Sequence, residues 1–337
     1  MENLHNVIEF QQARNFSQKM SATFDFIRQN FKSFAKSMLF IAGPPVILSS
    51  IFIGDIFNRF MGLSVAASQS QFGNSSAQQM QDYFSSSTFW LQILGIILFA
   101  WIGGVITIAT TYAYMRIYSE KKTTAIEVSE VWARVRQTFW MHFGTLTLYV
   151  ILMMAFFVIL AIPLGIVMGL AGVISPFLAI IGVLAFYLFV FMFSINMSLI
   201  FIIREAENIG FFDALTRLFY LIKNKMWSTF GIGIINVLIQ STVSMVFFLP
   251  WYISFIISLM HRTSGDAFEE PSSIMTTVNS IFLILYFVCN TLLYSLPMIA
   301  LAFQYYNLVE LKESRGLLSN IESFGESTAQ PQNDEHY

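Results

Sequence analysis

Four long stretches of this 337-residue chain contain no Asp, Glu, Lys, Arg or His, and they cover residues 83–115, 143–203, 226–260 and 271–309. Each stretch is longer than the roughly 20 apolar residues that cross the hydrocarbon core of a bilayer. Only 11% of the chain is charged, whereas soluble domains average about 25%. In lipid a backbone must satisfy its own hydrogen bonds, so these stretches predict transmembrane helices.

The lengths of the stretches predict six spans. The stretch 143–203 is too long for one helix, and Pro163, Pro176 and three glycines between them predict two spans joined by a tight turn. Another apolar stretch begins after Lys36. The spans are expected near residues 36–55, 88–115, 143–163, 177–203, 228–259 and 278–307. One transmembrane domain would cover residues 1–312, and the polar, acidic segment 313–337 is expected to be largely disordered.

Basic residues predict the orientation. If there are six spans, 16 of the 18 Lys and Arg residues fall on the side of the termini, and only Arg59 and Arg262 fall on the other side. Basic residues in short loops stay on the cytoplasmic side, so both termini are expected in the cytoplasm. The first 35 residues lack the apolar segment of a cleavable signal peptide, so span 1 is expected to direct insertion. The expected location is the bacterial inner membrane.

An apolar stripe recurs three times along the chain. At a constant offset of 195, Phe16, Met20, Phe24, Ile27 and Phe31 match Phe211, Leu215, Phe219, Ile222 and Met226, with Val128, Trp132, Val135 and Phe139 in the same register between them. This spacing is one face of an α-helix. We expect three repeats, about residues 14–118, 122–204 and 209–309, each an amphipathic interfacial helix plus a helical hairpin. The interfacial helices should cover 16–36, 124–144 and 211–231 along one membrane face.

The same register predicts contacts with lipid headgroups. The candidate residues are Arg28, Arg136, Lys223, Trp140 and Trp227, because basic and tryptophan side chains favour the membrane boundary. The first copy departs from the pattern. It carries Lys32 where the others carry Trp, and Lys36 where they carry glycine. Its span is therefore expected to enter the membrane differently.

Neutral polar residues inside the spans are the other candidates for a site. They include Gln92, Asn196, Asn236, Gln240 and Asn290. Asn236 and Gln240 are four residues apart and share one helix face, so they could line a polar cavity or hydrogen-bond to a neighbouring helix. Prolines 44, 45, 163, 250 and 297 are expected to kink helices, and Gly103 and Gly104 to allow close helix packing.

Residues that could carry catalysis are few. The four histidines have no metal-ligand spacing, and His142 is expected at the cytoplasmic interface. Cys289 is the only cysteine and falls inside span 6. The chain also lacks a glycine-rich phosphate loop. We therefore expect no enzymatic activity, cofactor, metal site or nucleic-acid partner.

The segment REAENIGFFDALTRLFYLIKNKMWSTFG, residues 204–231, has a recognisable pattern. Acidic residues follow a span, a Gly-aromatic-x-Ala-Leu helix and a basic turn come next, and a tryptophan opens the following span. The segment resembles the membrane domain associated with glycerophosphoryl diester phosphodiesterases and its stand-alone bacterial relatives. The segment YYNLVELKESRGLLSNIESFG also resembles six-span membrane proteins of the Bacteroidetes group. Because only 28 residues follow span 6, phosphodiesterase activity is not expected.

Two functions remain open. A non-catalytic scaffold or accessory component of the cell envelope would contact membrane lipids and either an envelope protein or a second copy of itself. A permease or lipid-handling protein would use a neutral polar cavity between spans 2, 4, 5 and 6.

Overall fold

The computed structural model describes residues 7–69, 74–263, 273–316 and 318, and every regular element within them is helical. Six helical segments are long and apolar enough to cross a membrane, which confirms the predicted number. These segments are Phe16–Leu63, Ser87–Lys121, Val128–Gly169, Pro176–Glu207, Met226–Ile257 and Thr277–Glu313. The fold is therefore that of an all-α, multi-pass membrane protein.

The helices follow one another with short connections. The first segment consists of α1 (Phe16–Ser37), a π-helical turn (Met38–Ala42) and α2 (Gly43–Gln69). Next come α3 (Asn74–Ser85), α4 (Ser87–Lys121) and the hairpin of α5 (Val128–Ile174) and α6 (Pro176–Met197). The chain continues with α7 (Leu199–Glu207), α8 (Phe211–Ile222), α9 (Met226–Thr263), α10 (Ser273–Leu292) and α11 (Ser295–Glu313).

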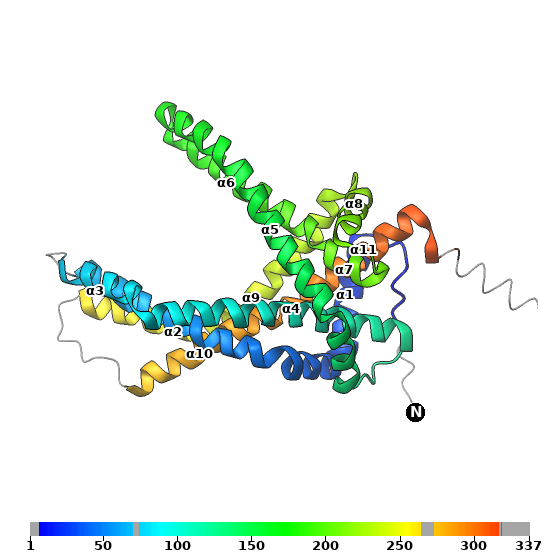
Figure 1. Ribbon diagram of the computed structural model, residues 1–337, viewed down its shortest axis with the longest axis horizontal. Helices are drawn as coiled ribbons and strands as arrows, with labels where there is room; N and C mark the ends of the chain where they lie inside the picture. The colour runs from blue at the N-terminus through cyan, green and yellow to red at the C-terminus, as the bar shows by residue number, and fades with distance from the viewer. Residues whose placement is uncertain (1–6, 70–73, 264–272, 317, 319–337) are drawn as a thin grey trace, which may run out of the picture.

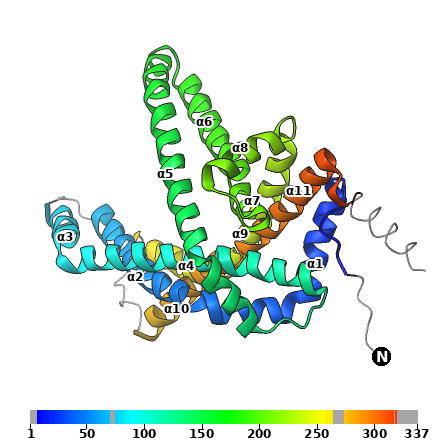
Figure 2. The same cartoon turned by 45° about the vertical axis from the view of Figure 1, so that its right-hand side comes forward.

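The first segment bends at the π-helical turn. There the backbone N–H of Gly43 donates to the carbonyl of Met38, five residues back. Pro44 and Pro45 follow directly and have no N–H to donate, so the regular helical pattern cannot run through this point. Figure 2 shows the resulting change of direction between α1 and α2.

Two more membrane-crossing segments are interrupted. Ser198 separates α6 from α7, and a short turn ahead of Pro297 separates α10 from α11. Pro163 and Pro250 instead lie inside helices that stay continuous, α5 and α9. Proline therefore marks an interruption at two of its expected places and not at the other two.

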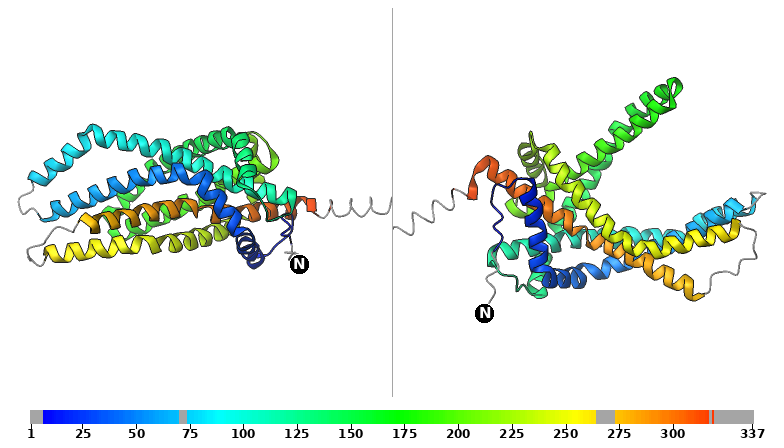
Figure 3. Two further views of the ribbon diagram at one scale, coloured as in Figure 1. Left: turned by 90° about the horizontal axis from the view of Figure 1, so that it is seen from below. Right: turned by 180° about the vertical axis from the view of Figure 1, so that it is seen from behind.

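The molecule has a base and two diverging arms (Figure 1, Figure 3). The base is formed by α1, α7, α8, α11 and the adjoining ends of α4 and α5, which pack together. Fully buried side chains such as Phe26, Tyr114, Ile203 and Phe303 form its core. The outer parts of α2, α3, α4, α9 and α10 form the main arm, and α5 with α6 forms the hairpin arm. Most of the buried apolar core thus lies at one end of the protein.

Close helix packing in the main arm follows the glycine pattern. A Cβ at Gly103 on α4 would lie 3.1 Å from Val46 Cγ2 on α2, so a larger residue here would require Val46 or its helix to shift. This contact agrees with the packing role expected for Gly103.

The three-repeat arrangement is not confirmed. The helix α1 joins its span through a π-helical turn, whereas α5 begins only at Val128 and runs unbroken into its span. The third stripe is split between α8 and α9 by a turn at Asn224, which has a positive φ of 65°. The stripes also face different surroundings, since Phe16 is 43% exposed but its counterpart Phe211 is 7% exposed. Three similar sequences are thus placed in three different ways.

Candidate functional site

The last turn of α7 carries three charged residues within the base. Residues 199–203 of this helix are all buried, and the charged residues Arg204, Glu205 and Glu207 follow immediately. The helix ends at Asn208, which adopts the left-handed conformation that asparagine tolerates well. The apolar helix α7 therefore ends in three charged residues at the edge of the core. We call Arg204, Glu205 and Glu207, together with the side chains that contact them, the charged hub.

Arg204 on α7 forms hydrogen bonds to α5. Its Nη1 donates to the carbonyl of Met141 at 3.2 Å and to Thr145 Oγ1, and its Nε donates to the carbonyl of Ile209 at 3.2 Å. The guanidinium therefore holds α5, α7 and the loop after α7 together. Its hydrogen bonds satisfy polar groups in a region where few waters could replace them.

Glu205 makes a second connection to α5. Its Oε2 lies 3.2 Å from His142 Nε2, and its Oε1 accepts a hydrogen bond from Arg134 Nη2 at 3.5 Å. The side chains of His142 and Glu205 are 0% and 3% exposed. Arg134 is 29% exposed and also lies 4.0 Å from the more exposed Glu120, so it connects the buried carboxylate with the surface.

His142 has one nitrogen engaged and one free. Its ring stacks with that of Tyr112 at a centroid distance of 6.2 Å, while its buried Nδ1 has no hydrogen-bond partner among the described residues. A buried carboxylate and imidazole are costly to separate, because the partner left behind would be unpaired in a poorly solvated place. This pair therefore holds the base of the hairpin arm firmly against α7.

Glu207 connects the hub to α8 and α11. Arg217 on α8 donates to both Glu207 oxygens at 2.9 to 3.1 Å and to both oxygens of Glu313 on α11. The Tyr305 hydroxyl donates to Glu207 at 2.9 Å, and Arg315 lies 2.7 Å from Glu313. The hydrogen bonds to Glu313, reinforced by those to Glu207, raise the pKa of Arg217 further above its usual value. Arg217 is therefore a permanent cation between two carboxylates.

The chemistry of the hub is that of a structural connection. Its acids are matched by arginines or by histidine, so the charges compensate one another at the point where α5, α7, α8 and α11 meet. Among the described residues, no group of three His, Cys, Asp or Glu side chains is arranged to hold a metal ion.

The predicted lipid-contact residues lie on the surface. Trp140 and Trp227 are 74% and 72% exposed. The Arg28 side chain is 80% exposed and pairs with Asp25 at 3.0 Å. Arg136 lies over the exposed ring of Trp132, and Lys223 is also exposed. These positions are compatible with headgroup contact, which stays a prediction.

The five candidate cavity residues are not brought to one place. Gln92 Nε2 donates to Asp55 Oδ2 at 2.5 Å, and Gln240 Nε2 donates to Asn290 Oδ1 at 2.7 Å. The side-chain amides of Asn196 and Asn236 donate to carbonyls of their own helices, at Met192 and Ile232 respectively. Their side-chain oxygens are buried and have no hydrogen-bond partner in the part of the chain that the structure describes. Gln92, Gln240 and Asn290 therefore connect neighbouring elements. Asn236 also donates to Met20 Sδ on α1 at 3.3 Å, and Asn196 donates within its own helix.

Reasoning from sequence missed the hub because the buried side of α5 extends beyond the predicted stripe. That stripe runs through Val128, Trp132, Val135 and Phe139. Val135 is buried as expected, but the buried side also includes Val131 and His142 beside the stripe. The spacing of four and then seven residues is also helical, so the signal was present but ambiguous.

The comparisons add no relatives. No family model, curated protein or solved structure matches this chain. The resemblance of residues 204–231 to a phosphodiesterase-associated membrane domain stays a prediction. In the structure this same segment contains the hub residues Arg204, Glu205, Glu207 and Arg217.

Proposed function

We propose that this protein is a non-catalytic scaffold or accessory component of the bacterial inner membrane, with both termini in the cytoplasm. The observation that carries the proposal is the hairpin arm. The most apolar stretch of α5 has no buried residue, and that of the segment containing α6 and α7 is only 6% buried. Apart from the face on which they pack against each other, these two spans are thus little covered by the rest of the described chain, while the hub holds their base in place.

An exposed hairpin is suited to binding another membrane helix. Ile159, Ile162 and Ile166 lie on one face of α5 and are 63 to 67% exposed. In lipid such a face is covered by acyl chains unless a helix with complementary packing replaces them. The partner would be an apolar transmembrane helix of another envelope protein, or the same hairpin of a second copy.

Polar contacts in the main arm support a scaffold more than a passage. Gln240 connects α9 to Asn290 on α10, and Trp251 Nε1 donates to Asn58 Oδ1 on α2 at 2.8 Å. Asn279 Nδ2 donates to Ser254 Oγ at 2.6 Å across α9 and α10. Their hydrogen-bonding capacity is used between helices, where it stabilises one arrangement of the main arm.

A lipid-handling function is the second candidate, and one groove favours it. The groove lies between the hairpin arm and α8 and has a volume of about 440 Å³. Apolar side chains including Leu152, Phe156, Phe193, Leu215 and Phe219 line it. A groove of this kind accommodates an acyl chain, and it is distinct from the neutral polar cavity expected from the sequence.

Photo-crosslinking in native membranes tests the scaffold proposal. A photoreactive amino acid is placed at Ile159, Ile162 or Ile166, with Leu94 on the main arm, which is 61% exposed, as the matched control. If a partner helix binds the hairpin, we expect a protein adduct of the same mass from all three α5 positions and none from Leu94. Lipid adducts alone at every position would reject the scaffold, and equal protein adducts at Leu94 would show that the hairpin has no special role.

A further inference from the structure

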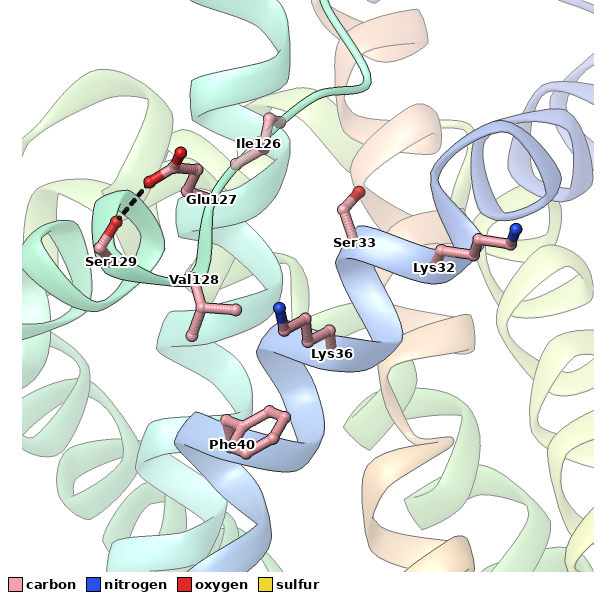
Figure 4. Close-up of a pocket in the computed structure, with 8 residues that line it drawn as sticks. All are labelled: Lys32, Ser33, Lys36, Phe40, Ile126, Glu127, Val128 and Ser129. Atoms are coloured by element: carbon pink, nitrogen blue, oxygen red, sulfur yellow. Dashed lines mark hydrogen bonds between the residues drawn. The ribbon is translucent and has the colours of Figure 1, made fainter.

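A basic cavity lies between α1 and the start of α5, away from the charged hub. Its volume is about 650 Å³, and its lining includes Lys32, Ser33 and Lys36 from α1 and Ser129 from α5 (Figure 4). In Figure 4 Lys36 reaches from α1 toward the start of α5, while Lys32 lies one turn earlier and extends to the other side in this view. The two ammonium groups are four residues apart on one helix, so both are within reach of the cavity mouth.

The two lysines are not neutralised by the protein. Neither has a hydrogen bond or ion pair with another described residue, whereas the nearby Lys121 pairs with Glu130 at 2.7 Å. The one carboxylate of the lining, Glu127, accepts a hydrogen bond from Ser129 Oγ at 3.1 Å. Two cations and one anion leave the cavity with an excess of positive charge.

The start of α5 borders this cavity through Val128 and Ser129. At the start of α5, the Val131 N–H donates a hydrogen bond to the Glu127 carbonyl at 3.3 Å. The N–H groups of the residues before Val131 precede the regular bonding of the helix, and such groups with the helix dipole favour an anion. The Lys36 ammonium group and the start of α5 therefore lie on opposite sides of the cavity, and Lys32 adds a second cation to its lining.

The cavity changes from polar to apolar along the direction of the first span. Phe40 lies one turn after Lys36 and is 68% exposed, and Val128 completes the apolar part of the lining. The helix continues from there into α2, so Phe40 lies nearer the membrane interior than the lysines do. A polar anion followed by a hydrocarbon chain matches this order.

The two lysines also break the sequence pattern. At the matching positions the second and third stripes carry Trp140 with Gly144 and Trp227 with Gly231. In those two copies a tryptophan can anchor the helix at the membrane boundary. Anchoring alone therefore does not require the two lysines of the first copy. A function particular to α1 accounts for the departure.

We propose that this cavity binds the phosphate group of an anionic phospholipid such as phosphatidylglycerol, with Lys32 and Lys36 contacting the phosphate and Phe40 contacting an acyl chain. The site would hold one lipid where the first span enters the membrane. It does not depend on the scaffold function, because it uses neither the hairpin face nor the hub.

Lipid titration of the purified full-length protein, followed by native mass spectrometry, tests the site. Phosphatidylglycerol and phosphatidylcholine are compared for the unchanged protein, for K32Q/K36Q and for the charge-matched control K122Q/K225Q, whose lysines are exposed and are not among the predicted headgroup contacts. K32Q/K36Q should weaken phosphatidylglycerol binding roughly 10- to 30-fold, as expected for two cations at an anionic surface. The control should change binding less than about twofold, and K32R/K36R should retain it.

Three results would overturn the proposal. An equal loss in K32Q/K36Q and K122Q/K225Q would show a diffuse attraction to charge rather than a site. Unchanged binding in K32Q/K36Q would exclude these lysines. Displacement of the lipid by millimolar inorganic phosphate or glycerol phosphate, in the unchanged protein alone, would assign the cavity to a free phosphate compound instead of a lipid.

Discussion

The buried contact between Glu205 and His142 provides the sharpest test of the hub. Glu205→Leu removes the partner that His142 Nε2 has at 3.2 Å among the described residues, and one of the carboxylates near Arg134. Removing one partner of a buried charged contact typically costs about 3–5 kcal/mol. Arg134 is partly exposed and can turn to Glu120, so we expect the lower end, about 3 kcal/mol.

His142→Leu should cost less, because Glu205 keeps its contact with Arg134. We expect about 1–2 kcal/mol from the loss of this hydrogen bond. The double variant, with two leucines facing each other, leaves no unpaired partner. Its cost should be smaller than the sum of the single costs by at least about 1 kcal/mol, which is the coupling between the two side chains.

The assay is reversible unfolding in mixed micelles, with Asp25→Ala as the control. Asp25 pairs with Arg28 on the surface, where their side chains are 45% and 80% exposed, so its loss should cost no more than about 0.5 kcal/mol. Hydrogen exchange of residues 128–145 should rise in Glu205→Leu, because the hub holds that part of α5. Additive single effects, or a Glu205→Leu cost no larger than that of Asp25→Ala, would refute the role assigned to the pair.

Three further predictions follow from other parts of the molecule. Arg217→Lys, which loses the forked contacts with two carboxylates, should destabilise the protein by about 1–2 kcal/mol and speed hydrogen exchange in α8, whereas unchanged exchange would show that α8 is held by apolar packing alone. Replacing Asn236 and Gln240 by Leu should cost about 1 kcal/mol in stability and leave a scaffold active, so a lost cellular phenotype at normal protein level would favour transport. A cysteine at Ser75 should react with an impermeant reagent from outside the cell and a cysteine at Lys122 should not, and the reverse pattern would overturn the orientation.

The number of membrane-crossing segments could be read directly from the sequence. Hydrophobicity is a local property, so an uncharged run of sufficient length predicts a span whatever its neighbours are. The connection between the first helix and its span was also signalled locally, since Lys32 and Lys36 replace residues expected from the other stripes and the Pro44–Pro45 pair precludes a regular helix.

The pairing of side chains was decided only by the tertiary structure. His142 and Glu205 are 63 residues apart, and Lys36 meets the start of α5 across nearly a hundred residues. Whether such residues meet depends on the rotation of each helix about its axis, and a sequence with two competing helical stripes does not specify that rotation. For the same reason similar stripes were placed differently: a stripe can be stabilised equally by lipid or by protein, and only the packing of the whole chain determines which one covers it.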